Sequence, residues 1–276
     1  PVVTDGQVTP NTPDYALSNS YELTHYADLI DFPTPHEDRR ISESQARKLM
    51  HGYYACVSFV DAQIGRLLTA LKDEGLDENT IVFFSGDNGG NDYFKSSEHP
   101  RGLHAANVHP ETGEEFRGTK GTLYEGGLRI PALAYWPGRI EGGRVSDHLW
   151  YFPDILPTIA ALTGKPLPKG KKIDGLDVSG LWKGTKRESP RKEFLHYTSR
   201  GNIEGLRSDN WKLLVKKPRR ANNRPPQIFL FDLSKDLGEK NNLAQAKPTV
   251  VKELQARMKA LDAEITENAR SPWFKK

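Results

Sequence analysis

The sequence predicts an α/β protein whose larger part is followed by a small subdomain with an antiparallel sheet and a covering helix. Apolar residues recur every three or four positions over residues 42–74, which is typical of an amphipathic helix. The apolar run at residues 81–84 lacks polar alternation, as in a strand that is buried on both faces. Strand-like stretches and a terminal helix succeed one another after about residue 190, and this order is typical of an α+β unit.

Composition places the chain among globular proteins that can bury a core in one large domain, or in one domain with an appendage. The 39 basic and 36 acidic residues are near balance; the net charge of +3 suits an anionic substrate, and we expect no nucleic-acid partner. No apolar run approaches the roughly 18 residues of a membrane span. The chain opens at Pro1 without a methionine or a signal peptide, so we expect a mature or truncated piece.

Residues 1–40 are expected to form a long loop or insertion, because prolines interrupt every periodic stretch there. A helix should begin after Ser42, whose spacing to Gln45 matches a capping box, and it should stop at Gly75. Cys56 lies within this helix and is expected to be a small buried hydrophobe. As the only cysteine it excludes an intrachain disulfide, and it leaves the cellular compartment undecided.

The later elements complete the α/β part and then build the subdomain. A second apolar strand is expected at residues 131–136, and a second helix at 154–162. Beyond them the pattern predicts strands at residues 194–198, 206–217 and 227–233, and an amphipathic helix at 248–268. Consecutive strands with one covering helix describe a small antiparallel α+β subdomain.

A carboxylate and a carboxamide stand side by side where the first strand ends, at Asp87 and Asn88. The carboxyl ends of strands in parallel α/β sheets are where ligands bind, and these oxygens suit Ca²⁺ or Mg²⁺. The neighbouring glycines let the backbone approach a ligand closely. The residues by themselves favour an ordinary Asx-type turn that closes a strand.

A second polar stretch lies between the two predicted strands of the α/β part. Lys120 stands there between Gly118 and Gly121, with Thr119 alone intervening. A lysine on so constrained a backbone suits a fixed positive charge for an oxyanion. A solvent-exposed loop lysine is the alternative.

These motifs together carry a family resemblance. Residues 85–90 read Ser-Gly-Asp-Asn-Gly-Gly, residues 117–132 read Arg-Gly-Thr-Lys-Gly-Thr-Leu-Tyr-Glu-Gly-Gly-Leu-Arg-Ile-Pro-Ala, and residues 230–244 read Leu-Phe-Asp-Leu-Ser-Lys-Asp-Leu-Gly-Glu-Lys-Asn-Asn-Leu-Ala. Over about residues 40–265 the chain resembles the type I sulfatases, which belong to the alkaline phosphatase superfamily and use a formylglycine nucleophile.

The resemblance implies the C-terminal part of an alkaline-phosphatase-like α/β sandwich at residues 41–168 and the small antiparallel subdomain at 190–270. It implies a calcium-dependent sulfuric ester hydrolase in which Asp87 and Asn88 bind Ca²⁺ and Lys120 contacts the sulfate. A hard cation and a fixed ammonium both stabilise charge that builds up on sulfate oxygens. A sulfated saccharide or small molecule is the implied substrate, and a secreted, periplasmic or lysosomal location is implied as well.

The chain departs from the family in its first part. Formylglycine arises in a Cys/Ser-x-Pro/Ala-x-Arg motif, which is not present here, because Val57 and Ser58 follow Cys56. The family's N-terminal metal-binding aspartates are also missing. We therefore expect the C-terminal portion of a sulfatase, inactive alone, with the N-terminal half of the same enzyme as its partner.

Histidines and an arginine offer further candidates for binding substrate. His99, His104 and His109 gather with Arg101 in the loop between the two motifs, where specificity is usually set. Taken alone, residues of this kind in a loop are more often simply solvated. His196 ends a predicted strand and could face the floor of the pocket, or it could be a satisfied structural histidine.

Two other functions remain open for the sequence. One is a phosphodiesterase or phosphonate hydrolase of the same superfamily, which would share the metal-binding turn. The other is a non-catalytic carbohydrate-binding or structural fragment. The glycine-rich stretch around Lys120 favours sulfate.

Overall fold

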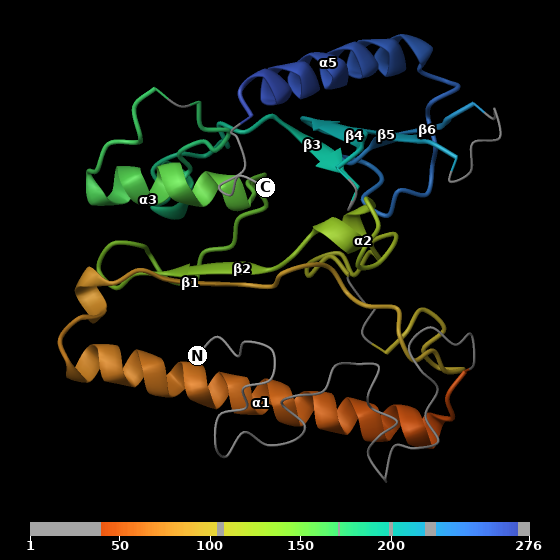
Figure 1. The fold of residues 1–276 in the computed structure, drawn as a ribbon. Coiled ribbons are helices and arrows are strands. Elements are labelled where there is room, and N and C mark those ends of the chain that lie inside the picture. Colours follow the sequence, from red (N-terminus) through yellow and green to blue (C-terminus); the bar gives the residue numbers. More distant parts are fainter. Residues whose placement is uncertain (1–39, 104–107, 171, 199–200, 219–224, 270–276) are drawn as a thin grey trace, which may run out of the picture. The chain divides into compact units, whose positions relative to one another are not determined.

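The computed structural model describes residues 40–103, 108–170, 172–198, 201–218 and 225–269 (Figure 1). The chain divides into two compact units, one of residues 1–64 and 90–107 and one of residues 65–89 and 108–276. The loop expected at residues 1–40 lies, except for residue 40, outside the described residues. The three-part division of the sequence stays a prediction.

The first unit is built around the start of helix α1 (Glu43–Asp73), whose bounds confirm the expected helix. The capping box forms: the Gln45 amide donates to Ser42 Oγ over 3.2 Å, and the Ser42 amide donates to Gln45 Oε1 over 3.0 Å. Ile41, Ala46 and Leu103 form a small buried cluster at this end of the helix.

Further along α1 the apolar side chains are exposed, among them Tyr54, Val57, Phe59 and Val60. Cys56 is exposed as well, so the expectation of a buried cysteine is wrong. The helical period that predicted the element is present, but no described segment covers this part of the helix. The periodicity of a helix predicts an apolar stripe, whereas its burial depends on other parts of the protein.

In the second unit, the turn after α1 contains the 3₁₀-helix η3 (Asp77–Asn79) and leads into β1 (Val82–Ser85), which pairs antiparallel with β2 (Ala132–Tyr135). The expected burial of the first strand on both faces is wrong. Phe83 packs on one side against Trp150 and Trp182, with ring centroids 5.6 and 5.8 Å away. On the other side Phe84 and Leu133, which pair with each other, are 49% and 64% exposed. Among the described strands, β1 has only β2 as a neighbour, so its other edge has no described partner.

Short helices follow: η4 (Phe152–Asp154), α3 (Ile155–Thr163), which confirms the second expected helix, and α4 (Ser179–Trp182). The buried Asp154 carboxylate joins them to the next sheet, because it accepts from Arg191 Nε over 2.7 Å and from the Leu176 amide over 2.7 Å. Arg191 also stacks over the Tyr151 ring at 4.1 Å. These donors satisfy the hydrogen-bonding capacity of a carboxylate that would otherwise be costly to bury.

The small subdomain holds a four-stranded antiparallel sheet in the order β3 (Glu193–Tyr197), β4 (Ile203–Ser208), β5 (Trp211–Lys216) and β6 (Gln227–Asp232). The prediction of one strand over residues 206–217 is wrong. That stretch turns at Asp209 and Asn210, and Asp209 takes a φ of 47°. Asp and Asn tolerate this left-handed conformation, so the pair forms a hairpin turn inside an otherwise strand-like sequence.

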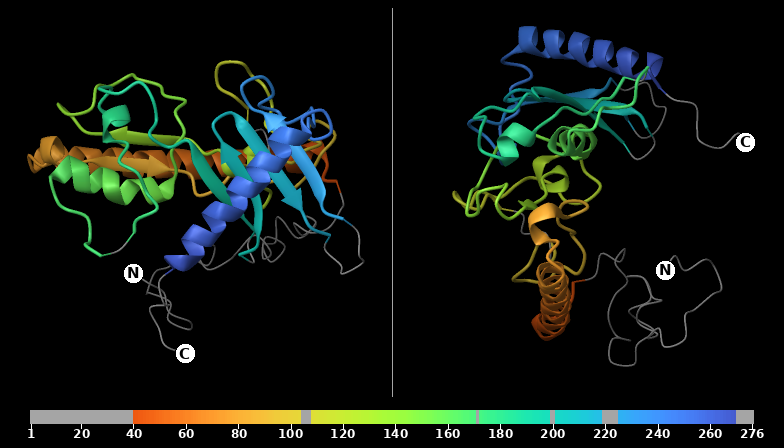
Figure 2. Two further views of the ribbon diagram at one scale, coloured as in Figure 1. Left: turned by 90° about the horizontal axis from the view of Figure 1, so that it is seen from above. Right: turned by 90° about the vertical axis from the view of Figure 1, so that its left-hand side faces the viewer.

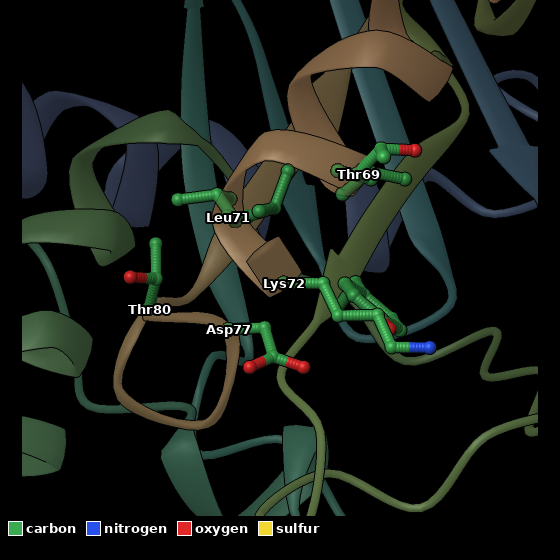
Figure 3. Close-up of a pocket in the computed structure, with 8 residues that line it drawn as sticks. Thr69, Leu71, Lys72, Asp77 and Thr80 are labelled. Atoms are coloured by element: carbon green, nitrogen blue, oxygen red, sulfur yellow. The ribbon is translucent and has the colours of Figure 1, made fainter. Parts of the chain in front are cut away.

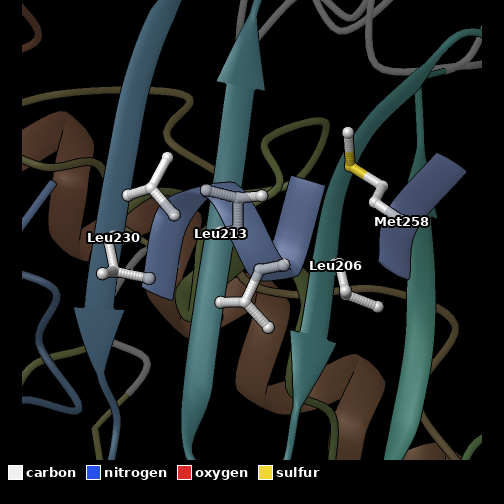
Figure 4. Close-up of a cluster of buried hydrophobic side chains, with 6 residues drawn as sticks. Leu206, Leu213, Leu230 and Met258 are labelled. Carbon is white, nitrogen blue, oxygen red and sulfur yellow. The ribbon is translucent and has the colours of Figure 1, made fainter. Parts of the chain in front are cut away.

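Helix α5 (Pro248–Glu267) crosses over one face of this sheet, as Figure 2 shows, and confirms the predicted terminal helix. Leu206, Leu213 and Leu230 of the strands pack there against Val251, Leu254 and Met258 (Figure 4). The opposite face buries Leu214 and Phe231, against which Tyr124 packs. Because side chains alternate along a strand, adjacent Leu213 and Leu214 belong to different cores, and both faces of the sheet are covered.

Candidate active site

The candidate metal ligands lie on a loop that is pinned at both ends. The Gly86 amide donates to the Pro131 carbonyl over 3.3 Å, and the Gly89 amide donates to the Gly127 carbonyl over 3.2 Å. Between them the Asp87 side chain is exposed and Asn88 is partly exposed. Among the described residues, neither side chain has a hydrogen-bond or ion-pair partner. Two hard oxygen donors are therefore offered by a backbone that is itself held in place.

Lys120 is carried by a tight turn that its neighbours close. The Thr122 amide donates to the Thr119 carbonyl over 3.0 Å, and Thr122 Oγ1 donates to the same carbonyl over 2.8 Å. Gly118 and Gly121 flank the turn with backbone φ angles of 76° and 83°, which residues other than glycine rarely adopt. The Lys120 side chain is exposed and forms no ion pair within the part of the chain that the structure describes.

Both loops rest on α2 (Glu125–Leu128), a single short helical turn. The loop after β1 reaches it through Gly89, where an added Cβ would lie 2.0 Å from the Gly126 carbonyl oxygen. The Lys120 segment reaches it through the Gly126 amide, which donates to the Arg117 carbonyl over 2.7 Å. Since these contacts are backbone to backbone, the structure brings Asp87, Asn88 and the Lys120 turn onto one support.

Beneath α2 lies a buried cluster of charges that the sequence analysis missed. Lys212 Nζ on β5 lies 2.8 Å from Glu125 Oε1 and 3.0 Å from Glu239 Oε1. Arg129 Nε lies 2.8 Å from Glu125 Oε2. The cations outweigh burial and lower the pKa of Glu125 to about 2, whereas burial raises the pKa of Glu239. The one sequence signal was a lysine in an apolar strand, since buried charges need partners.

The substrate-binding candidates are in different surroundings. His196 is buried on β3, and its Nε2 has no hydrogen-bond partner among the described residues. Burial and the nearby Lys212 lower the pKa of His196 to about 3, so the ring is neutral at physiological pH. His109 is also buried, and its Nδ1 accepts from the Glu111 and Thr112 amides over 3.3 Å. A role in binding substrate stays a prediction for both.

Other candidates lie in the first unit or outside the described residues. His104 lies outside them, and Arg101 is partly exposed. His99 Nδ1 lies 3.2 Å from Ser96 Oγ, and its ring lies near the carboxylates of Glu43 and Glu98. Both oxygens of Glu43 already accept hydrogen bonds, from Ser96 Oγ and from the Glu98 amide, so this group ties the loop to α1.

A pocket of about 190 Å³ lies at the other end of β1 (Figure 3). Leu68 and Lys72 of α1, Asp77 and Thr80 line it, together with both strands. Thr80 precedes β1 and Asp87 follows it, so the pocket is distinct from the candidate site. Among the helices described, none is long and apolar enough to cross a membrane.

Comparison with known proteins gives a consistent result. The family described as Sulfatase matches residues 12–165, and the family described as N-sulphoglucosamine sulphohydrolase, C-terminal, matches residues 113–264. Human arylsulfatase A is 38% identical over 236 residues, which cover 75% of this chain and 43% of that protein. The chain thus spans less than half the length of this relative.

Solved structures agree with the sequence matches. A sulfatase from Pseudoalteromonas sp. is 28% identical with a TM-score of 0.56, covering 77% of this chain and 42% of its own. A structure from work on the metabolism of multiple glycosaminoglycans by Bacteroides thetaiotaomicron is 25% identical with a TM-score of 0.59, covering 74% and 43%. The predicted α/β fold class is confirmed.

The neutral His196 makes stability depend on pH. As pH falls below about 6.5 the unfolded chain takes up a proton at this residue, but the folded protein does not until about pH 3. Between pH 6.5 and 4 this lowers the free energy of unfolding by about 3 kcal/mol. Urea unfolding of His196→Gln should show a flatter dependence over this range. His148→Gln, at an exposed histidine, should keep the wild-type dependence; equal slopes for all three proteins would contradict the assignment.

Proposed function

This chain belongs to the sulfatase family, and we propose that it forms the part of a sulfuric ester hydrolase that binds calcium and the sulfate group. The observation that carries the proposal is the shared support of the two loops on α2. The backbone of both loops is held by hydrogen bonds and close packing. The side chains of Asp87, Asn88 and Lys120 have no hydrogen-bond or ion-pair partner among the described residues. That combination is typical of sites whose polar groups are kept for a ligand.

The donors fit calcium. Asp87 offers a carboxylate and Asn88 a carboxamide, both of which are oxygen ligands that Ca²⁺ prefers. The exposed Asp87 side chain is open to an ion, and no described cation competes for it. Bound there, Ca²⁺ would supply positive charge to the sulfate oxygens. The proposed role of this chain is to hold the calcium ion with the side chains of Asp87 and Asn88.

Lys120 supplies the second positive charge. Its ammonium extends from a turn that the Thr119–Thr122 hydrogen bonds keep rigid. A charge that is fixed before the reaction stabilises the developing negative charge without reorganisation in the transition state. We assign Lys120 to binding the sulfate oxygens and not to moving a proton.

The nucleophile is proposed to come from an upstream segment that this chain does not contain. Cys56 is exposed on α1 but is followed by valine and serine, and not by the residues of a formylglycine motif. The edges of this two-stranded sheet that lack a described partner fit further strands from that segment, and the exposed Phe84, Leu133 and Tyr135 on its outer face fit a covering layer from the same segment. The upstream half of the same enzyme is thus the proposed partner, with formylglycine as its nucleophile.

The proposed substrate is a sulfated saccharide. Support comes from the structural relative that was studied for glycosaminoglycan metabolism, which is 25% identical to this chain. A sulfated sugar presents the anionic group that Asp87-bound calcium and Lys120 would hold together. Smaller sulfate esters present the same group, so comparing kcat/KM for a sulfated disaccharide and an aryl sulfate tests the proposed preference directly.

Calcium binding should depend on Asp87. In the protein assembled with its upstream half, Asp87→Ala should weaken Ca²⁺ binding by more than about 100-fold, because even indirect partners of metal ligands contribute 10- to 100-fold. Calorimetric titration of Ca²⁺ into the metal-free protein measures this. The control is Asp73→Ala, which removes an exposed carboxylate at the end of α1 and should leave binding unchanged. A wild-type affinity for Ca²⁺ in Asp87→Ala would contradict the proposal that Asp87 is a calcium ligand.

Removing the charge of Lys120 should reduce catalysis without affecting folding. Lys120→Ala should lower kcat/KM for a sulfate ester by about 100- to 1,000-fold, the usual effect of one group that stabilises an oxyanion. The melting temperature should stay unchanged, because the side chain is exposed. Lys217→Ala removes an exposed lysine just beyond β5 and serves as the control. Unchanged kinetics in Lys120→Ala would rule out this role.

The upstream half should be needed for a stable fold and for activity. The 276-residue chain expressed alone should bind a hydrophobic dye and hydrolyse no sulfate ester, and co-expression with the upstream half should reverse both results. Leu133→Asp should weaken the assembly, because it places a charge on the exposed face of β2. Val145→Asp, at an exposed loop valine, should not. A monomeric, cooperatively unfolding chain without dye binding would show that no such partner is required.

A further inference from the structure

We propose that Lys212 is a positioning residue for the candidate active site. Through Glu125 and Glu239 it holds α2, on which the Asp87–Asn88 loop and the Lys120 turn both rest. This inference rests on the proposed function for its effect on catalysis. Its effect on the geometry of α2 does not depend on that function.

Lys212 is placed where it can act only through these two carboxylates. Its side chain is fully buried on the face of the sheet that lies toward α2, and its Nζ bridges Glu125 Oε1 at 2.8 Å and Glu239 Oε1 at 3.0 Å. A buried ammonium needs partners of opposite charge. The side chain has no access to solvent and so no direct contact with a substrate, which distinguishes it from Lys120.

Glu239 fixes the start of α2. Its Oε2 accepts from the Glu125 amide over 2.6 Å, and its own carbonyl accepts from Arg117 Nη1 over 2.9 Å. Residues 117 and 125 bound the segment that carries Lys120, so both ends of that segment are tied to Glu239. Lys212 is the cation that pairs with the Glu239 carboxylate among the described ion pairs. Without it, this buried carboxylate would lose its counter-charge.

Displacement of α2 would move both loops, because their backbones are in direct contact with the backbone of α2. The Gly127 carbonyl accepts from Gly89, next to Asn88, and the Gly126 amide donates to Arg117. Added Cβ atoms at Gly89 and Gly126 would lie 2.0 and 2.4 Å from neighbouring carbonyl oxygens. Backbone packed this closely moves as a unit. Lys212 therefore sets the separation between the calcium ligands and the sulfate lysine.

The test compares Lys212→Met with Leu254→Ala in the protein assembled with its upstream half. Leu254 lies in the core under α5, on the other face of the same sheet, so its truncation destabilises the subdomain without touching α2. Both variants are assayed well below their melting temperatures. Amide hydrogen exchange of residues 117–127, Ca²⁺ affinity and kcat/KM are measured for each. Lys212→Arg, which restores a cation, is the conservative variant.

If Lys212 positions the site, the amide hydrogens of residues 117–127 should exchange faster in Lys212→Met than in the wild-type protein. The kcat/KM of this variant should fall about 100-fold, the effect of a displacement of about 1 Å. Its Ca²⁺ affinity should fall, and Lys212→Arg should recover part of each loss. Leu254→Ala should keep wild-type values at low temperature. Equal behaviour of Lys212→Met and Leu254→Ala would show that Lys212 contributes only stability, and would overturn the proposal.

Two further results keep the test decisive. If Lys212→Met does not fold, Glu239→Gln replaces it, because the amide oxygen can still accept from the Glu125 amide while the charge pair with Lys212 is lost. Faster exchange at residues 117–127 in that variant supports the proposal, and wild-type exchange overturns it. If the wild-type protein hydrolyses no sulfate ester, the proposed function fails, and the exchange measurements still decide whether Lys212 holds α2.

Discussion

The buried bridge from Lys212 to Glu125 and Glu239 is the interaction on which the second unit depends. Three charged groups removed from water are costly to bury, and that cost is offset only while Lys212 Nζ stays close to both carboxylates. The low pKa of Glu125, about 2, reflects how strongly the surrounding cations hold its charge. This mutual dependence joins the sheet of the small subdomain to the segment that carries the candidate site. Neither part can be repositioned without breaking the cluster.

Above this cluster the site is built from backbone contacts. Glycines at positions 89, 126 and 127 allow three segments to approach more closely than side chains would permit. The backbone hydrogen bonds are used to join the loops, which leaves Asp87, Asn88 and Lys120 uncommitted. A rigid support with free polar side chains is an arrangement that favours binding an anion and its metal ion without reorganisation.

Two parts of the protein expose large apolar surfaces. The middle of α1 and the outer face of β1 and β2 expose large apolar side chains of the kind that protein cores usually bury. The family relatives are more than twice as long as the matched segment, as the 43% coverage of arylsulfatase A shows. The small subdomain differs, because both faces of its sheet are covered by residues of this chain. An apolar face is therefore buried in this protein where another described segment of the chain packs against it.

The sequence by itself determined the features that depend on near neighbours. The period of α1 and α5, the Ser42–Gln45 cap and the polar turn after β1 are local, and all are present. The local signal failed at residues 206–217, where a two-residue turn divides an otherwise strand-like run. Only the tertiary structure decided the burial of Lys212 and the role of Glu239. Their contacts with Glu125 join residues 87 and 114 positions apart, and whether a charge is buried depends on such distant partners.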